Sequence, residues 1–229
     1  MFADYKKRNQ KNIHNCLDSI QSPLLVIAHP DDESMFYVPT VDYLVKHNKN
    51  LHILCFTTGN FNGLGEIRKQ ELYKAAMSLG IKGDNVEVLD DKNYLDGMKA
   101  VWDINKAVKT LSNYIHEHSI DCIFTFDNYG VSGHPNHISC FQICVQYLQL
   151  MKIGIPLYTL QSVSIIRKYI GVFDYMMSLM SKHAFMVYNN CIIENIHAMK
   201  SHASQFVWFR WLFVLFSRYT TINTWNKIE

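Results

Sequence analysis

The sequence lacks several features that would by themselves define a class of protein. It has no run of about 18 or more apolar residues, so we expect no transmembrane helix. Its first residues contain no apolar stretch of the kind that secretory signals carry, and we expect no signal peptide. The formal net charge is only +2 and no basic stripe with interleaved aromatics is present, which argues against a nucleic-acid partner.

None of the six cysteines stands in a CxxC pair, which argues against a zinc finger. Cys140 and Cys144 are four positions apart in a predicted helix and would share one of its faces. Buried, reduced thiols are the simplest interpretation of the whole set. They fit a reducing compartment that faces the cytosol.

The composition is that of one folded domain. The 229 residues are 48% hydrophobic and 18% charged, and no linker or repeat interrupts them. We expect a polar N-terminal segment over residues 1–22 and a single domain over residues 23–229. The polar segment is expected to be a solvated tail; attraction to anionic headgroups is the alternative for its basic residues Lys6, Lys7, Arg8 and Lys11.

Short apolar runs alternate with helical spacing along most of the chain. Strands are expected at Leu24–Ala28, Leu51–Thr57, Val86–Leu89, Asp121–Phe126, Leu157–Val163 and Ala184–Tyr188. Helices are expected at Glu33–His47 with a kink near Pro39, at Glu66–Leu79, at Asp103–His118 and at His134–Leu150, and the chain from Arg167 onward is expected to be mostly helical. This alternation predicts an α/β fold: a Rossmann-like, doubly wound, mostly parallel sheet with helices on both faces.

Three polar segments directly follow predicted strands. They are His29–Glu33, Thr58–Asn60 and Asp127–His137. In doubly wound sheets, ligands bind beyond the carboxyl ends of the strands, at a switch in strand order. We therefore expect these segments to converge on one crevice.

Two of these segments hold the residue types of a metal site. His29–Glu33 places one imidazole and three carboxylates in five positions, and His134–His137 adds two imidazoles. Like charges this close repel each other unless a cation compensates them. Catalytic zinc takes three His or carboxylate ligands, which leaves one carboxylate and one His for acid–base work. Taken singly, each cluster also suits a surface turn or a helix start; together they favour a metal-dependent hydrolase.

At these residues the sequence resembles the PIG-L/LmbE family of metal-dependent de-N-acetylases. The C-terminal part is similar to the eukaryotic branch, the N-acetylglucosaminyl-phosphatidylinositol de-N-acetylases, which act in the second step of glycosylphosphatidylinositol (GPI) anchor synthesis. The resemblance rests on Ala28–Glu33, Gly63–Leu72, Gly133–His137, His202–Gln205, Trp208–Arg210 and Phe216–Tyr219.

The resemblance implies a role for six residues. His29, Asp32 and His137 match the family's zinc ligands, and Asp31 matches the general base that deprotonates water. His134 matches the residue that stabilises the oxyanion or assists the departing amine, and Arg68 matches an arginine that contacts the substrate.

Other residues near these motifs leave two interpretations open. Arg68 and Glu71 lie three apart on a helix, so a plain surface ion pair is the alternative to a substrate contact. Glu33 either orients a ligand or starts a helix. Asp127 either holds the imidazole of His134 or caps a turn.

His202 and Gln205 either line the sugar or phosphate end of the pocket or form a structural pair on a helix. Phe206–Phe216 is too short to span a bilayer, and its Trp and Phe residues around Arg210 suit an interfacial helix. A helix buried against the sheet is the alternative. Eukaryotic members of the family carry an N-terminal membrane-spanning segment, whereas here the first strand is expected within about two dozen residues of the start.

We therefore expect an amide hydrolase with one divalent metal, zinc, that deacetylates an N-acetylglucosaminyl lipid. The resemblance implies a peripheral position on the cytosolic face of the endoplasmic reticulum. One alternative is a deacetylase of a small soluble N-acetylglucosamine conjugate. A metal-dependent phosphoesterase, which often uses two metals, and a degenerate scaffolding subunit are further alternatives.

Overall fold

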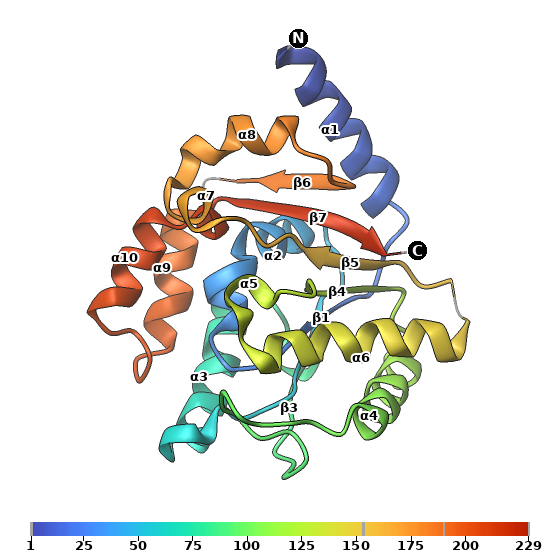
Figure 1. Cartoon of the computed structure of the whole chain (residues 1–229), viewed down its shortest axis with the longest axis vertical. Helices are drawn as coiled ribbons and strands as arrows, with labels where there is room; N and C mark the ends of the chain where they lie inside the picture. The colour runs from blue at the N-terminus through green and yellow to red at the C-terminus, as the bar shows by residue number, and fades with distance from the viewer. Residues whose placement is uncertain (1, 153, 190, 229) are drawn as a thin grey trace.

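A seven-stranded sheet forms the centre of the molecule (Figure 1). The computed structural model describes residues 2–152, 154–189 and 191–228. The strands are β1 (Pro23–Ile27), β2 (His52–Cys55), β3 (Val86–Val88), β4 (Cys122–Phe126), β5 (Leu157–Leu160), β6 (Phe185–Tyr188) and β7 (Ile222–Ile228). Their order is β3-β2-β1-β4-β5-β7-β6; β1 to β5 pair in parallel, and β7 pairs antiparallel with both β5 and β6.

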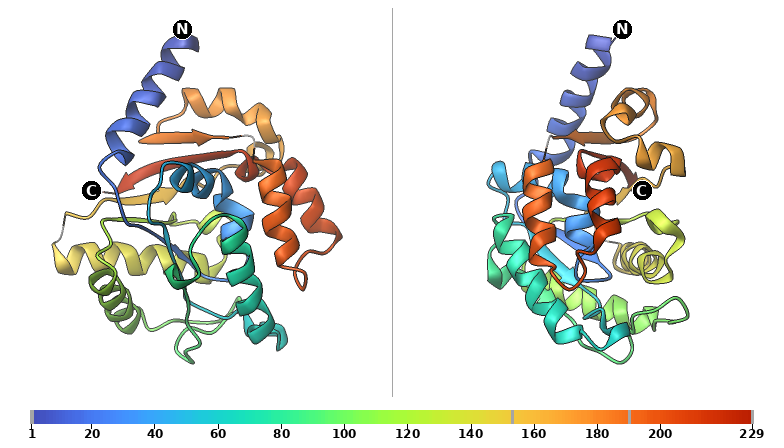
Figure 2. Two further views of the ribbon diagram at one scale, coloured as in Figure 1. Left: turned by 180° about the vertical axis from the view of Figure 1, so that it is seen from behind. Right: turned by 90° about the vertical axis from the view of Figure 1, so that its left-hand side faces the viewer.

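Helices cover both faces of this sheet. They are α1 (Phe2–Leu17), α2 (Val38–Lys46), α3 (Gly65–Ser78), α4 (Ile104–Glu117), α5 (Gly130–Gly133), α6 (Pro135–Met151), α7 (Ile165–Tyr169), α8 (Asp174–Met180), α9 (Ile192–Ser201) and α10 (Trp208–Phe216). Figure 1 has α4 and α6 in front of the sheet, and the view from behind in Figure 2 has α2 and α3 in front. The doubly wound α/β fold is confirmed. In the described ranges no helix combines the length and the apolar character needed to cross a membrane.

The strand order places a topological switch between β1 and β4. From β1 the chain runs outward to β2 and β3, and it then returns to the other side of β1 with β4. The two strands are paired in register, with Leu24 beside Ile123. Because both strands point the same way, the segments that follow them begin at the same edge of the sheet. The sequence therefore predicted the location of the crevice correctly.

The apolar pattern accounts for the elements that were predicted well. All five residues of β1 are buried, as expected for a central strand of a parallel sheet. The helix expected at Asp103–His118 is α4, and its apolar residues Val108, Leu111 and Ile115 are buried on one face. The helix predicted from Glu33 begins as a π-helical turn over Glu33–Tyr37 and continues as α2, so the predicted kink lies at this junction.

Three segments differ from expectation. Residues 2–17 form the helix α1, where a solvated tail was expected; the amide of Asn9 exchanges two hydrogen bonds of 2.8 Å with the backbone of Met186 on β6. The strand β7 lies in the region expected to be mostly helical. The polar segment Asp127–His137 contains the single helical turn α5 before the predicted helix begins, and no helix was expected there. Each of these depends on partners far away along the chain.

Candidate active site

The segment after β1 is folded by its own carboxylate. Asp32 accepts hydrogen bonds at Oδ2 from the backbone N–H groups of Ala28 (3.0 Å) and His29 (2.8 Å). All residues from His29 to Glu33 are buried. The side chains of this segment therefore have fixed positions at the edge of the sheet.

Asp31 occupies a backbone conformation that few residues other than glycine adopt. Its φ is 134°, and such strain costs about 1–3 kcal/mol. Two contacts hold the segment in place: Glu33 accepts from the backbone N–H of Asp31 (3.2 Å), and Arg68 donates to the carbonyl of Pro30 (2.9 Å). The carboxylate of Asp31 lies 3.0 Å from Nη2 of Arg210 and 3.5 Å from Nη2 of Arg68. Two guanidinium groups therefore orient it.

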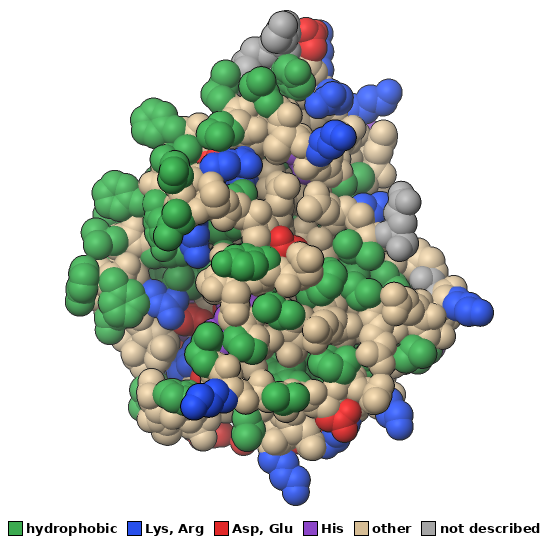
Figure 3. Space-filling model, in the orientation of Figure 1, with side chains coloured by type: hydrophobic (Ala, Val, Ile, Leu, Met, Phe, Trp, Pro, Cys, Tyr) green, Lys and Arg blue, Asp and Glu red, His purple; other side chains and the backbone are tan. Residues whose placement is uncertain are grey.

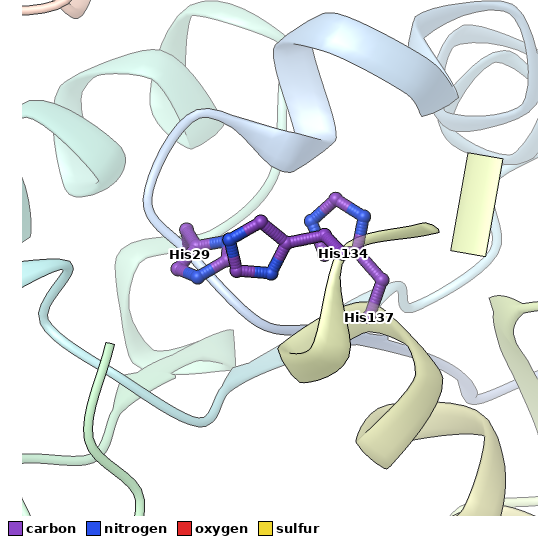
Figure 4. A group of neighbouring side chains, drawn as sticks. All are labelled: His29, His134 and His137. Carbon is purple, nitrogen blue, oxygen red and sulfur yellow. The ribbon is translucent and has the colours of Figure 1, made fainter. Parts of the chain in front are cut away.

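Three imidazoles from two distant segments meet beside this carboxylate. Figure 4 shows His29, from the segment after β1, next to His134 and His137 at the start of α6. One ring nitrogen of each lies within 4.8 Å of the others. Asp32 lies among them: its Oδ1 is 3.2 Å from Nε2 of His137, and its Oδ2 is 3.7 Å from Nδ1 of His29.

The outer nitrogens of two of these rings are already engaged. Nε2 of His29 lies 3.0 Å from a carboxylate oxygen of Asp96, and Nδ1 of His137 donates to the carbonyl of Gly130 (3.0 Å). Nδ1 of His29 and Nε2 of His137 are therefore directed at Asp32. Metal-binding histidines are commonly oriented in this way by a carboxylate or a backbone carbonyl.

His134 differs from the other two rings. Its Nδ1 accepts a hydrogen bond from the backbone N–H of Asn136 (3.2 Å), so the ring proton belongs on Nε2. Burial, together with the charges of His29 and His137, lowers the pKa of His134 to about 4. At neutral pH it is therefore an uncharged hydrogen-bond donor in the wall of the pocket.

The electrostatics of the cluster favour a positive charge. Burial opposes ionisation of Asp32, but His137 and His29 hold the pKa of this carboxyl well below its usual range. Burial likewise opposes charge on His29, yet Asp32 and Asp96 raise the pKa of this imidazole to about 10. A divalent cation would supply the positive charge that the protonated imidazole otherwise provides. The donor set of imidazoles and one carboxylate suits zinc.

Arg68 does not form the surface ion pair that was considered with Glu71. It is buried; its Nη1 donates to the carbonyl of Gly59 (2.8 Å) and lies 3.7 Å from Asp96. A Cβ at Gly59 would lie 2.4 Å from the guanidinium carbon, so only glycine permits this approach. Glu71 instead accepts from the backbone N–H (2.7 Å) and the hydroxyl (2.6 Å) of Ser204. Thr58–Asn60 therefore contacts Arg68, which lines the pocket, but none of its own residues lines it.

Asp127 caps a turn and is not bonded to His134 among the contacts of the described residues. It accepts hydrogen bonds from the backbone N–H groups of Tyr129 and Gly130, and it also binds the backbone and hydroxyl of Ser162. The interpretation as support for His134 is therefore wrong. Asp127 accepts from the backbone N–H of Gly130, and the carbonyl of Gly130 accepts from Nδ1 of His137. Asp127 therefore supports His137 indirectly, through the backbone of Gly130.

Glu33 and His202 form a buried pair behind the site. Nε2 of His202 lies 2.6 Å from Oε1 of Glu33. His202 does not line the pocket, whereas Gln205 does. Glu33 therefore supports Asp31 through the backbone, and His202 supports Glu33.

Sequence reasoning missed two charged residues of the site. Asp96 lies in the loop between β3 and α4, several residues beyond the strand, so the rule for segments that directly follow strands did not include this carboxylate. Arg210 was expected only as part of an interfacial helix, but its guanidinium lies 3.0 Å from the carboxylate of Asp31. The available signal for a role of Arg210 in the site was its position as a single charged residue within an apolar run.

The site lies at the base of a pocket of about 760 Å³. Its polar wall includes Asp31, Arg68 and Asp96. Its outer wall is apolar and comes from α7 and α10, with Tyr169, Phe209, Leu212 and Phe216 among its residues, together with Lys168. A ligand with a polar end and an apolar end matches this gradient.

Comparison with known proteins agrees with this geometry. The sequence model of the PIG-L family, described as GlcNAc-PI de-N-acetylase, matches residues 24–148. A probable N-acetylglucosaminyl-phosphatidylinositol de-N-acetylase of Schizosaccharomyces pombe is 39% identical over 222 residues, which cover 91% of this chain and 88% of the relative. The N-acetylglucosaminyl-phosphatidylinositol de-N-acetylase of Bos taurus is 39% identical over 208 residues, 89% of this chain and 82% of the relative.

Among solved structures, the N,N'-diacetylchitobiose deacetylase of Pyrococcus horikoshii has the same fold. It superposes with a TM-score of 0.70 over 98% of this chain and 90% of that chain, at 16% sequence identity. The family match covers more than half of this chain, and the two relatives cover most of it. The chain belongs to the PIG-L family of GlcNAc-PI de-N-acetylases.

Proposed function

We propose that this chain hydrolyses the acetamide of N-acetylglucosaminyl-phosphatidylinositol and releases acetate, the second step of GPI anchor synthesis. The observation that carries the proposal is the meeting of Asp31, Asp32 and the imidazoles at the base of one pocket. Its outer wall is apolar, as a lipid-linked sugar requires. The names of the relatives from S. pombe and B. taurus support the same substrate.

One divalent ion, zinc, would be held by His29, Asp32 and His137. Nδ1 of His29 and Nε2 of His137 both face Asp32, so the three donors can share one ion. When bound, such an ion polarises the acetyl carbonyl and makes a neighbouring water more acidic. Asp96 and Gly130 hold the two rings by their outer nitrogens.

Asp31 is the general base. Its carboxylate takes a proton from the attacking water and returns it to the departing nitrogen, so that the C–N bond breaks and the amine leaves neutral. Arg210 and Arg68 orient this carboxylate from two sides. Nε2–H of His134 donates to the oxygen that becomes negative as the carbonyl is attacked.

The enzyme would work at the cytosolic face of the endoplasmic reticulum as a peripheral protein. All six cysteines are free thiols, which fits a reducing compartment. Trp208 and Phe209 on α10 are exposed. Of the two interpretations of Phe206–Phe216, this exposure supports the interfacial helix and not the helix buried against the sheet.

Acetate release tests the proposal. The purified chain is given N-acetylglucosaminyl-phosphatidylinositol in detergent, and in parallel a small soluble N-acetylglucosamine conjugate. We expect turnover of the glycolipid, its loss after chelation, and its recovery with one equivalent of zinc per chain. Preference for the soluble conjugate would instead support the alternative function. A requirement for two metals per chain would support a phosphoesterase-like site.

A further inference from the structure

Two segments far apart in the sequence expose large apolar side chains on one side of the molecule. Residues 165–180, which include α7 and α8, expose Ile166 and Phe173, the latter by 80%. In α10, Trp208 is 74% exposed and Phe216 is exposed by more than half. We call the exposed apolar side chains of these two segments the docking face. Figure 3 shows them along the left edge of the molecule.

The two halves of the docking face adjoin each other. The ring of Tyr169 in α7 lies 6.3 Å from the ring of Phe213 in α10, and the ammonium of Lys168 lies 5.8 Å from both rings. Figure 2 shows α7, α8 and α10 on the same side of the molecule. The mouth of the active-site pocket lies between the halves, because both α7 and α10 line it.

The charged residues of the two segments that carry the docking face are cations, apart from one buried carboxylate. The only carboxylate within residues 165–180 is Asp174; it is buried and paired with Arg167 at 2.6 Å and Arg218 at 3.0 Å. The only charged residue of α10 is Arg210, which is paired with Asp31 inside the pocket, so the cation at the pocket mouth is Lys168 of α7. Beyond α8, a second cavity of about 460 Å³ between α8 and α1 is lined by Arg8 and Lys182, and among the residues that the structure describes no carboxylate lines it. An apolar face bordered by cations is complementary to an anionic lipid surface.

We propose that residues 165–180 dock, together with α10, on an anionic bilayer, with the pocket mouth facing the headgroups. The docking face gathers large apolar side chains next to one another, whereas soluble surfaces usually carry such residues singly. The proposal rests on the proposed function, because the glycolipid substrate would enter through this pocket mouth. Whatever covers the mouth must therefore deliver the substrate. A protein partner seated there would block the mouth, whereas a bilayer supplies the glycolipid. Only the contribution of α10 was expected from the sequence; the structure adds the exposed apolar side chains of residues 165–180.

The test is flotation with vesicles that contain no substrate. The full chain is mixed with vesicles of phosphatidylcholine, or of phosphatidylcholine with about a third phosphatidylserine. Ile166→Ser/Phe173→Ser should lower the affinity for anionic vesicles about tenfold or more, since two large apolar side chains lose their lipid contact. Val101→Ser, at a residue 93% exposed in the loop before α4, should leave it unchanged. All three proteins should hydrolyse a soluble N-acetylglucosamine conjugate equally, because neither Ile166 nor Phe173 lines the pocket.

A second measurement needs no variant. Of the four tryptophans, Trp102 and Trp225 are buried, whereas Trp208 and Trp211 lie on α10. Brominated lipids in the anionic vesicles should quench the fluorescence of wild-type protein, and less so for Ile166→Ser/Phe173→Ser.

Equal vesicle binding by the double variant and wild type would overturn the proposal, as would equal quenching. A dimer in light scattering that the double variant abolishes would assign the docking face to a second copy of the chain. Failure of the proposed function looks different: vesicle binding would still depend on Ile166 and Phe173, while no acetate would be released from the glycolipid.

Discussion

Nε2 of His202 lies 2.6 Å from Oε1 of Glu33, and both side chains are fully buried. Burial by itself would lower the pKa of His202, but the charge and hydrogen bond of Glu33 outweigh burial and raise it. The pair joins the end of α9 to the segment that carries Asp31, because Glu33 also accepts from the backbone N–H of Asp31. A contact between two residues outside the pocket thus maintains the strained backbone of the base.

Removing one partner of this pair should be costly. His202→Leu leaves the carboxylate of Glu33 buried without its cation, and we expect the free energy of unfolding to fall by about 3–5 kcal/mol. Urea denaturation of metal-free protein measures this loss. Glu33→Gln/His202→Leu removes both charges and should recover much of it. A loss below about 1 kcal/mol for His202→Leu would show that the pair contributes little.

Asp31→Asn tests the general base. The amide keeps the size of the side chain but cannot take a proton from water, so kcat should fall by roughly 10²–10⁴-fold. Metal content, measured by elemental analysis, should remain that of wild type, because Asp31 is not among the proposed ligands. Turnover near that of wild type, with metal still bound, would remove Asp31 from the mechanism.

His134 and His137 are close in space, yet we expect opposite results from them. His137→Gln removes a ligand and should lower zinc content per chain. His134→Gln should keep its zinc and lose roughly 10²–10³-fold in kcat, as expected when one donor to an oxyanion is removed. Equilibrium dialysis with zinc, followed by acetate release, separates the two effects. If His134→Gln binds no zinc, His134 is a ligand, and the geometry of the three imidazoles allows for that result.

The sequence predicted the parts of the site that local patterns encode. The apolar runs of β1 and β4 and the polar segments after them were sufficient to predict that His29 and His137 meet across the switch in strand order. The role of Asp127 could not be read locally, because a carboxylate before a Gly-containing turn serves a cap or an imidazole equally well. Only the positions of Gly130 and Ser162 decide it.

The missed elements depend on long-range contacts. The strand β7 has the polar sequence Ile-Asn-Thr-Trp-Asn-Lys-Ile, and periodicity gave no strand there. Its buried Asn223 is satisfied by the backbone and hydroxyl of Thr40 and by the carbonyl of Phe36, which lie far back in the chain. Polar residues become core residues only when such partners exist. The same holds for Arg210, whose partner Asp31 belongs to another element.

Acid should destabilise the fold through a histidine outside the site. The side chain of His52 is buried: its Nε2 accepts from the amide of Asn50 (3.0 Å), and its Nδ1–H donates to the hydroxyl of Tyr114 (3.2 Å). Burial, with the positive charges of His118 and Lys82, lowers the pKa of His52 to about 4. In the unfolded chain a histidine titrates near 6.5. Between these values the unfolded state binds more protons, so the stability present above pH 6.5 is lost as the pH falls toward 4.

The predicted loss of stability at low pH can be measured against a matched control. We expect the free energy of unfolding, from urea titrations at pH 7, 6 and 5, to fall less steeply for His52→Gln than for wild type. His116→Gln, at an exposed imidazole of the same region, should keep the wild-type slope. Equal slopes for wild type and His52→Gln would mean that His52 accepts its proton in the folded protein without loss. The hydrogen bonds to Asn50 and Tyr114 would then have to rearrange around the charged ring, because Nε2–H can no longer accept from Asn50.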